Sequence, residues 1–171
     1  MEKPSTARLA LKWGIIASVL LSIYTVVIYM TGFFKIGPMS FLSYFILLIA
    51  IILAAREFRS LNNNYMSFGE CLGLGTLLSA VTGVITSIFT YVYINMIDTT
   101  LMQQMEDLQR EQMEARGLTE EQISQALEMA AIFTRPSVMF LMGLFIYVLI
   151  GFVWSLIVSA VLKKDKPEMN F

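Results

Sequence analysis

The sequence predicts an all-α integral membrane protein, a four-helix bundle with an extracytoplasmic antiparallel helical hairpin between its third and fourth spans. Charged residues are 15% of the 171, yet four stretches carry none, at 13–34, 36–55, 71–97 and 136–162. Each is as long as the roughly 20 apolar residues that cross a bilayer, whereas a soluble core helix is shorter and interrupted by charge. In the charged segment at 98–135, apolar residues recur at helical spacing. We therefore expect a single membrane domain over residues 1–171, with a polar outer hairpin.

The first two spans are predicted to pair closely. The first opens after Lys12 and has a small residue at every fourth position, at Ala10, Gly14, Ser18 and Ser22. On a helix this spacing forms one stripe, which lets another helix approach. We expect Gly37-Pro38 to turn the chain outside the membrane, and Arg56 and Arg59 to mark the inner end of the second span.

The third span is predicted to begin near Phe68. Ser67-x-x-Glu70 before an apolar run is the capping-box pattern, in which each side chain accepts a hydrogen bond from an otherwise unpaired N–H group. The span has the longest small-residue stripe in the chain, which we expect to pack inside the bundle, at Gly75, Ser79, Gly83 and Ser87. The fourth span repeats the stripe at Gly151, Ser155 and Ser159. Its first residue, Pro136, suits the first turn of a helix, where an N–H group would be unpaired.

The outer hairpin is predicted from the residues that follow the third span. No Gly or Pro occurs from Val84 to Arg116, so we expect the third helix to continue unbroken over 68–116. At 1.5 Å per residue that helix would extend about 70 Å, well beyond the roughly 30 Å hydrocarbon core. Gly117 then follows the helix end, and Thr119-x-x-Gln122 is a second capping box that starts the returning helix.

The distribution of basic residues predicts the orientation. Eight of the 12 lie in the N-terminal segment, the loop at 56–70 and the C-terminal tail: Lys3, Arg8, Lys12, Arg56, Arg59, Lys163, Lys164 and Lys166. The other four share the opposite side with eight acidic residues. Because basic residues near span ends stay in the cytoplasm, both termini are expected to be cytoplasmic and residues 98–135 to lie outside.

Three polar residues are candidates for a functional site. Glu70, near a membrane boundary, could belong to a proton or cation path, although its capping-box position favours a helix cap. Asn95 and Asp98, at the outer end of the third span, could line an access path or mark the membrane interface.

A possible partner face lies on the hairpin. Its side chains are flexible or apolar and recur at helical spacing: Leu101, Met102, Met105, Leu108 and Met113. Methionine adapts to varied shapes, which suits a protein partner. Packing between the two helices of the hairpin is the simpler interpretation of the same residues.

The composition argues against catalysis and cofactor binding. The chain has no His and a single Cys, so it lacks an imidazole base, histidine metal ligands and an internal disulfide. It has no phosphate-binding glycine loop, nucleophile elbow or cysteine cluster. We expect no enzymatic activity, no cofactor and no metal. Nucleic acid is not an expected partner, because the chain has no basic patch away from the bilayer.

Several segments resemble a known family. They are "NNNYMSFGECLGLG" before the third span, "SIFTYVYINMIDTTLMQQ" at its end, "RGLTEEQISQALEMA" in the outer loop and "SLIVSAVLKK" before the tail. Together they resemble a bacterial family of small four-span membrane proteins catalogued as a domain of unknown function, DUF4199. The likeness covers nearly the whole chain, and "MSFGE" and "GLTEEQI" are its most specific parts. It implies a multi-pass protein of the bacterial inner membrane, and no activity or site residue.

These observations favour a non-enzymatic structural, scaffolding or assembly role. The polar part of the protein is concentrated at 98–135, while the spans carry packing stripes and no charge. That segment is expected to meet a membrane or periplasmic protein, or a second copy of the chain. The alternative is a small oligomeric transporter or channel subunit. The uncharged spans disfavour it, because transport proteins commonly keep a charged residue in the membrane.

Overall fold

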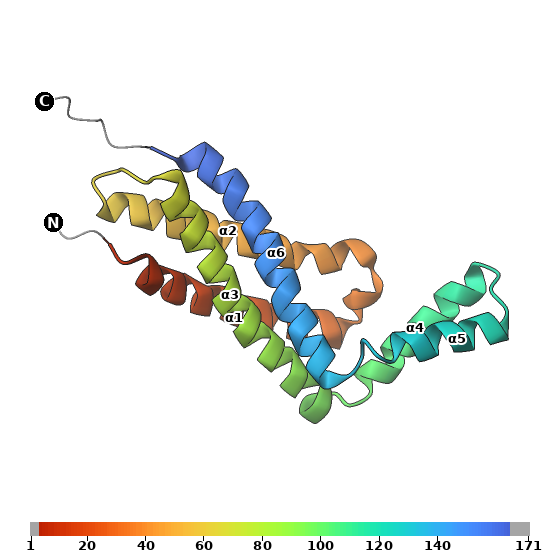
Figure 1. Ribbon diagram of the computed structural model, residues 1–171. Helices are drawn as coiled ribbons and strands as arrows, with labels where there is room; N and C mark the ends of the chain where they lie inside the picture. The colour runs from red at the N-terminus through yellow and green to blue at the C-terminus, as the bar shows by residue number, and fades with distance from the viewer. Residues whose placement is uncertain (1–3, 165–171) are drawn as a thin grey trace, which may run out of the picture.

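The computed structural model describes residues 4–164, and over this range the chain is helical apart from loops and one isolated β-bridge. The elements are α1 (Thr6–Thr31), η1 (Phe33–Lys35), α2 (Gly37–Leu61), α3 (Phe68–Val92), η2 (Tyr93–Ile97), α4 (Leu101–Ala115), α5 (Glu120–Ala130) and α6 (Pro136–Leu162). Helices α1, α2, α3 and α6 form a bundle, and α4 and α5 lie side by side beyond one end of it (Figure 1). Lys3 and Lys166, counted above for orientation, lie outside the described residues.

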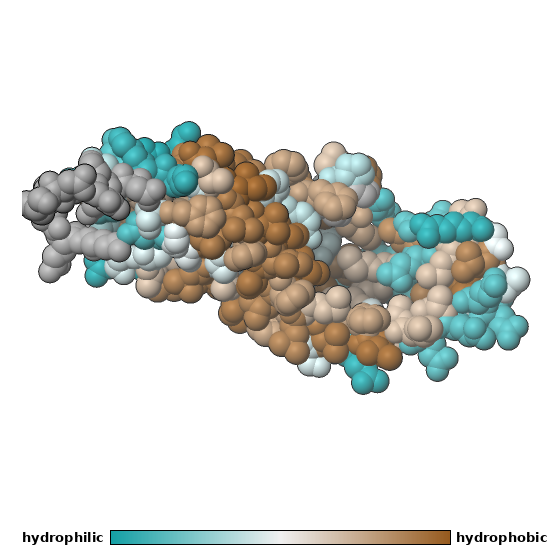
Figure 2. Space-filling model, turned by 45° about the horizontal axis from the view of Figure 1, so that its top comes forward, coloured by the Kyte–Doolittle hydropathy of each residue, from teal (hydrophilic) through white to brown (hydrophobic). Residues whose placement is uncertain are grey.

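The four bundle helices are each long and apolar enough to cross a membrane. Their outward faces carry large apolar side chains, among them Val19, Phe45 and Phe145, each about half exposed or more. Figure 2 shows this apolar surface over the bundle, with hydrophilic residues at one end and over α4 and α5. The chain is therefore a multi-pass membrane protein, because a water-soluble bundle would not expose such a surface.

Helix α3 is the centre of the bundle and packs most extensively against α6 and α1. Its Gly75 faces Ser155 of α6, and its Ser79 faces Gly151, so closely that a β-carbon on either glycine would overlap the serine. Against α1, a β-carbon on Gly14 would lie 2.8 Å from the side chain of Val81. The predicted burial of the stripe on the third span is confirmed, because all four of its residues are buried.

Hydroxyl groups buried at these contacts bond to their own helices. Ser79 Oγ donates to the carbonyl oxygen of Gly75 over 2.8 Å, and Ser155 Oγ donates to that of Gly151 over 2.6 Å. Thr82 Oγ1 lies 2.9 Å from the carbonyl oxygen of Leu78 and also 3.3 Å from that of Gly14 on α1. A hydroxyl in an apolar interior is costly unless it is bonded, so these bonds let small polar residues serve as packing residues.

The first turn of the chain differs from the prediction. Helix α1 ends at Thr31, and Gly32 follows in the left-handed conformation with φ +71°. Gly37 and Pro38 do not make the turn, because they already belong to the first turn of α2. A proline fits there because an N–H group in the first turn of a helix would be unpaired. Gly37-Pro38 therefore indicated the start of a helix and not the turn before it.

The second span is longer than its uncharged stretch. Helix α2 continues to Leu61, beyond Ala55, and its last turns carry charged side chains that include Arg56 and Glu57. A helix end at a membrane interface can carry charges without a break in its backbone, because long side chains reach the polar region. The uncharged stretch therefore predicted the apolar part of α2 correctly, but it did not predict where the helix ends.

The predicted continuous helix over 68–116 is wrong. Helix α3 ends at Val92, a turn of π-helix follows over Tyr93–Ile97, and Asp98 leaves the helical conformation at φ −127° and ψ 85°. The Asp98 carboxylate accepts hydrogen bonds from the N–H group of Thr100 over 3.1 Å and from its hydroxyl over 2.7 Å. Aspartate and threonine thus offer the backbone local partners outside a helix, and they end it without Gly or Pro.

The predicted signals at the start of α3 and between α4 and α5 are confirmed. Gly117 has φ +79°, and its N–H group donates to Glu114 while that of Leu118 donates to Met113, a Schellman motif. Thr119 and Gln122 form the capping box that starts α5. Ser67 and Glu70 form the same motif at α3, which begins at Phe68 as predicted.

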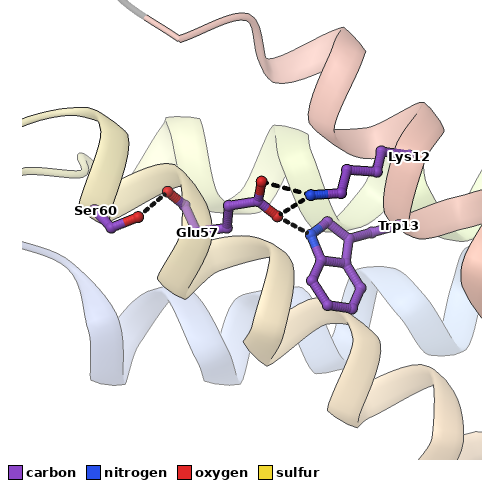
Figure 3. Close-up of polar contacts among 4 residues, drawn as sticks. All are labelled: Lys12, Trp13, Glu57 and Ser60. Atoms are coloured by element: carbon purple, nitrogen blue, oxygen red, sulfur yellow. Dashed lines mark hydrogen bonds and ion pairs between the residues drawn. The ribbon is translucent and has the colours of Figure 1, made fainter.

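The end of the bundle far from α4 and α5 is held by two polar contacts. Glu57 accepts hydrogen bonds from Lys12 Nζ, at 2.7 and 2.8 Å, and from Trp13 Nε1 at 2.6 Å, which joins the beginning of α1 to the end of α2 (Figure 3). At the same end, Met66 and Lys164 exchange two backbone hydrogen bonds of 2.9 and 2.8 Å. These bonds join the α2–α3 loop to the residues that follow α6.

The contact between α3 and α6 can be tested with two glycines on α3. We expect Gly75→Ala to lower the free energy of unfolding by about 1–3 kcal/mol, because its β-carbon would overlap Ser155. The matched control is Gly73→Ala, where a β-carbon meets nothing within 4 Å. It should raise stability by about 0.5–1 kcal/mol through helix propensity. Denaturant titration in detergent, followed by circular dichroism, measures both, and equal shifts would contradict this packing.

The Glu57 contacts can be tested in a Trp154→Phe background, where Trp13 is the remaining tryptophan. We expect Glu57→Ala to destabilise the protein by about 1–2 kcal/mol and to shift the emission of Trp13. Glu57→Gln should have a smaller effect, because its amide oxygen still accepts the bond from the indole.

Ser60→Ala is the control for the Glu57 variants. The Ser60 hydroxyl bonds only to the backbone oxygen of Glu57, at 2.8 Å, so its loss should leave the emission of Trp13 unchanged. An emission shift as large as that of Glu57→Ala would show that the carboxylate contacts do not hold Trp13.

Candidate functional site

A cavity of about 320 Å³ lies at the end of the bundle from which α4 and α5 project. All of the bundle helices, η1, η2 and the first turns of α4 contribute to it. The lining residues are Tyr24, Thr25, Ile28, Tyr29, Phe34, Ser43, Thr86, Ser87, Thr90, Tyr91, Ile94, Asn95, Met102, Met105, Thr134, Met139, Phe140, Gly143 and Tyr147. This volume is at the lower end of the range for small-molecule sites, roughly 300–1,000 Å³.

Aromatic contacts frame the cavity. The ring of Tyr29 lies edge-on to Phe34, with centroids 6.0 Å apart, and 5.5 Å from the ring of Tyr93. On the other side, Tyr147 of α6 meets Tyr44 of α2 at 6.4 Å. Aromatic side chains have few rotatable bonds, so such pairs hold a defined shape around the space.

Two buried hydroxyl groups in the lining have no hydrogen-bond partner among the described residues. They are Thr86 Oγ1 and Ser87 Oγ, on residues that are 3% and 8% exposed. Ser87 Oγ lies 2.7 Å from the position that a β-carbon on Gly143 would take, so α3 and α6 are close at this point. An unbonded buried hydroxyl costs about 1–3 kcal/mol, and a bound molecule with an acceptor or donor would recover that cost.

The predicted candidates at the outer end of the third span take different places. Asn95 is exposed and lines the cavity, and its Nδ2 donates to the carbonyl oxygen of Tyr91 over 2.8 Å. Asp98 is not among the lining residues, since its carboxylate is bonded to Thr100 in the loop before α4. Of the two, only Asn95 is placed to contact a molecule in the cavity.

Glu70 lies at the other end of α3 from the cavity. Its carboxylate accepts a hydrogen bond from the N–H group of Ser67 over 2.7 Å, and its own N–H group donates to Ser67 Oγ over 3.3 Å. This is the helix-cap arrangement that the sequence pattern favoured.

The residues predicted as a partner face are divided among three places. Leu101 is fully buried and packs with Tyr93 and Ile94 at the base of the projecting helices. Met102 and Met105 line the cavity. Leu108 and Met113 are half-buried further along α4. These residues therefore do not form one continuous exposed face.

Sequence reasoning missed Thr86, Ser87 and Glu57. The two hydroxyl residues lie within the uncharged third span, where the small-residue stripe drew attention to packing alone. Ser87 was predicted only as the last packing residue of that stripe, and the signal for a site was Thr86, which lies beside it and adds a second hydroxyl. Glu57 was assigned to a loop because it follows Arg56, and its partners are more than 40 residues away along the chain.

The part of the chain described offers no set of ligands for a metal ion. No group of three or more His, Cys, Asp or Glu residues between 4 and 164 is placed to hold an ion. Cys71 is buried and has no second cysteine to pair with.

Comparisons with known proteins identify the family. No curated protein and no solved structure matches the chain. The family described as "Protein of unknown function (DUF4199)" matches residues 12–164, a range that contains α2 to α6 and most of α1. The resemblance noted from the sequence segments is thereby confirmed, and the chain belongs to the DUF4199 family.

Proposed function

We propose that this protein is a membrane-anchored scaffold or assembly factor of the bacterial inner membrane. Both termini lie in the cytoplasm, and α4 and α5 project outside it as an antiparallel hairpin. There they bind a protein partner or a second copy of the chain. The protein carries out no catalysis of its own.

The observation that carries this proposal is the difference between the four spanning helices and the projecting helices α4 and α5. The four spanning helices bury their small residues against one another, whereas α4 and α5 extend beyond the bundle (Figure 1). Ile123 of α5 is fully buried, and Leu101 of α4 is fully buried against Tyr93 and Ile94 at the base of the projection. A projection that meets the bundle only at its base is suited to contact with another molecule.

The exposed surface of the projection favours a basic partner. Seven acidic side chains of α4 and α5 are exposed: Glu106, Asp107, Glu111, Glu114, Glu120, Glu121 and Glu128. One of them, Glu120, pairs with Arg110 at 3.1 Å. We place the partner contact on this charged surface and not on the apolar residues, because Leu101 is inaccessible. Complementary charge steers association and selects among partners.

The opposite end of the bundle supports the proposed orientation. Six basic residues of the described chain occur in the first turns of α1, the last turns of α2 and the end of α6: Arg8, Lys12, Arg56, Arg59, Lys163 and Lys164. These segments share the end of the bundle at which the described chain begins and ends (Figure 1). Retention of basic residues in the cytoplasm then places α4 and α5 outside.

The alternative, a small oligomeric transporter or channel subunit, stays a prediction. Leu47, Ile51, Leu74 and Leu78 fill the middle of the bundle and are at most 1% exposed. A path through a single copy would have to displace them, so transport would need an interface between copies.

The partner contact is tested by neutralising part of the acidic surface. We expect Glu106→Gln, Glu111→Gln and Glu114→Gln together to lower recovery of the partner about tenfold, because three rim ion pairs of roughly 0.5 kcal/mol each are lost. Crosslinking in native membranes, mild-detergent purification and mass analysis measure the recovery.

The control for that experiment is an uncharged triple variant on the same helix. Gln103→Ala, Gln109→Ala and Gln112→Ala change exposed positions of α4 and should leave partner recovery unchanged. A deletion of residues 101–133 that inserts normally and keeps every native interaction would overturn the scaffold proposal.

The orientation is tested separately by cysteine labelling in a Cys71→Ser background. We expect Ser124→Cys, on α5, to react with a membrane-impermeant maleimide in intact spheroplasts. Ser60→Cys, near the end of α2, should react only after the membrane is permeabilised. Both positions are exposed, so access to the reagent decides the result. The reverse pattern would refute the proposed orientation.

A further inference from the structure

We propose that the cavity at the base of α4 binds an uncharged amphiphile, a lipid-like molecule whose polar end carries oxygen atoms. The proposal does not depend on the scaffold role, because it rests on the cavity alone. The cavity has room for the head of such a molecule and the first part of its chain, since its volume is about 320 Å³.

The polar end of the ligand is assigned by the hydroxyl groups of Thr86 and Ser87. Both oxygens are buried and without a hydrogen-bond partner in the described structure, although both line the cavity. Ser79 and Thr82, on the same helix, bond to the carbonyl oxygens of their own helix. The buried hydroxyls of Thr76 and Ser159 also have no partner among the described residues, but neither residue lines the cavity. Thr86 and Ser87 are therefore the unpartnered buried hydroxyls that a molecule in the cavity can reach. Carbonyl, ester or hydroxyl oxygens of a ligand are suitable partners.

The absence of charge in the lining selects a neutral head. None of the lining residues, all within the described range, is charged. The nearby carboxylate of Asp98 is engaged by the N–H and hydroxyl groups of Thr100. A phosphate or carboxylate headgroup would lose its water here without gaining a cation from the lining, which is a large penalty. Lys35 Nζ lies 5.9 Å from the centroid of the Phe34 ring, and Lys35 is not a lining residue.

The apolar part of the ligand is assigned by the aromatic and methionine walls. Tyr29 and Phe140 provide rigid rings, and Met102 and Met105 provide flexible side chains that fit varied shapes. In this proposal the chain of the ligand leaves the cavity beside Tyr91, which lines the cavity, is 44% exposed and belongs to an apolar span. A membrane amphiphile can enter from that side with its chain remaining in lipid.

The occupant would contact the projecting segment directly. Met102 and Met105 belong to the first turns of α4, so a molecule in the cavity touches both the bundle and the base of the projection.

The test uses the purified, delipidated full-length chain in detergent and three probes. Decylubiquinone presents ring carbonyl oxygens, dioleoylglycerol presents ester and hydroxyl oxygens, and dioleoylphosphatidylglycerol presents a charged phosphate. Native mass spectrometry at several probe concentrations gives each dissociation constant. We expect one or both neutral probes to bind at one site per chain, and the charged probe at least tenfold more weakly. The neutral probe with the lower constant identifies the kind of head that the site accepts.

Two double variants separate this site from lipid on the outer surface. Thr86→Val with Ser87→Ala removes the unpartnered hydroxyls and should weaken the neutral probe about tenfold or more. The control, Ser79→Ala with Thr82→Val, removes two hydroxyls of the same kinds that already bond to backbone carbonyl oxygens outside the cavity, and should leave probe affinity unchanged. Without ligand, the first variant should unfold at the same temperature as the parent or higher, because it removes unbonded buried groups.

Three results would overturn the proposal. They are no saturable binding of either neutral probe, equal affinity for the charged probe, and equal loss of affinity in the two double variants. The test of the scaffold proposal changes other residues, on the acidic surface of α4. A negative result for the cavity therefore leaves the scaffold proposal intact, and loss of the scaffold proposal leaves the cavity proposal intact.

Discussion

The close approach of α3 to its neighbours is the constraint on which the rest of the bundle depends. In lipid, apolar side chains gain nothing by leaving water, so helices associate through van der Waals contact and hydrogen bonds. Such contact needs small residues, and α3 presents glycine to Ser155 of α6 and serine to Gly151 in return. Gly14 of α1 receives Val81 in the same way. Helix α2 then closes the bundle with Leu47 and Ile51, which are almost fully buried.

The same helix explains why the bundle is filled at its middle and open at one end. Small residues of α3 and α6 meet at three levels, of which Ser87 and Gly143 are the pair nearest this end, whereas Gly83 lies against Tyr147 and Leu144. Past that level the next position at the same spacing is Tyr91, a larger residue, and a turn of π-helix follows over Tyr93–Ile97. The cavity is therefore the consequence of a packing stripe that ends one turn before its helix does. Ser87, the last residue of that stripe, and its neighbour Thr86 both line the cavity, although Ser87 also lies close to Gly143 of α6.

The sequence could predict what depends on neighbours along the chain. The fourth span begins at Pro136 and ends at Leu162, as its uncharged stretch indicated, and the caps at Ser67 and Thr119 follow from spacing alone. The break at Asp98 could not be predicted from the absence of Gly and Pro, because side chains that accept backbone hydrogen bonds ended the helix instead. The contacts of Glu57 and the unpartnered hydroxyl of Thr86 are properties of the assembled bundle. They require knowledge of which helix lies opposite, which one sequence does not contain.

The two polar contacts at the far end of the bundle differ in when they can form during synthesis. A chain is made from its N-terminus, so Glu57 can meet Lys12 and Trp13 as soon as α2 has emerged from the ribosome. The backbone bonds between Met66 and Lys164 must wait until α6 is complete. Until then, α3 has its small-residue face toward α6 uncovered in the membrane. The last contact at this end of the bundle is thus made by one of the last residues described. A nascent chain arrested before Lys164 could form the contacts between α1 and α2 but would lack the backbone bonds that join the end of α6 to the α2–α3 loop.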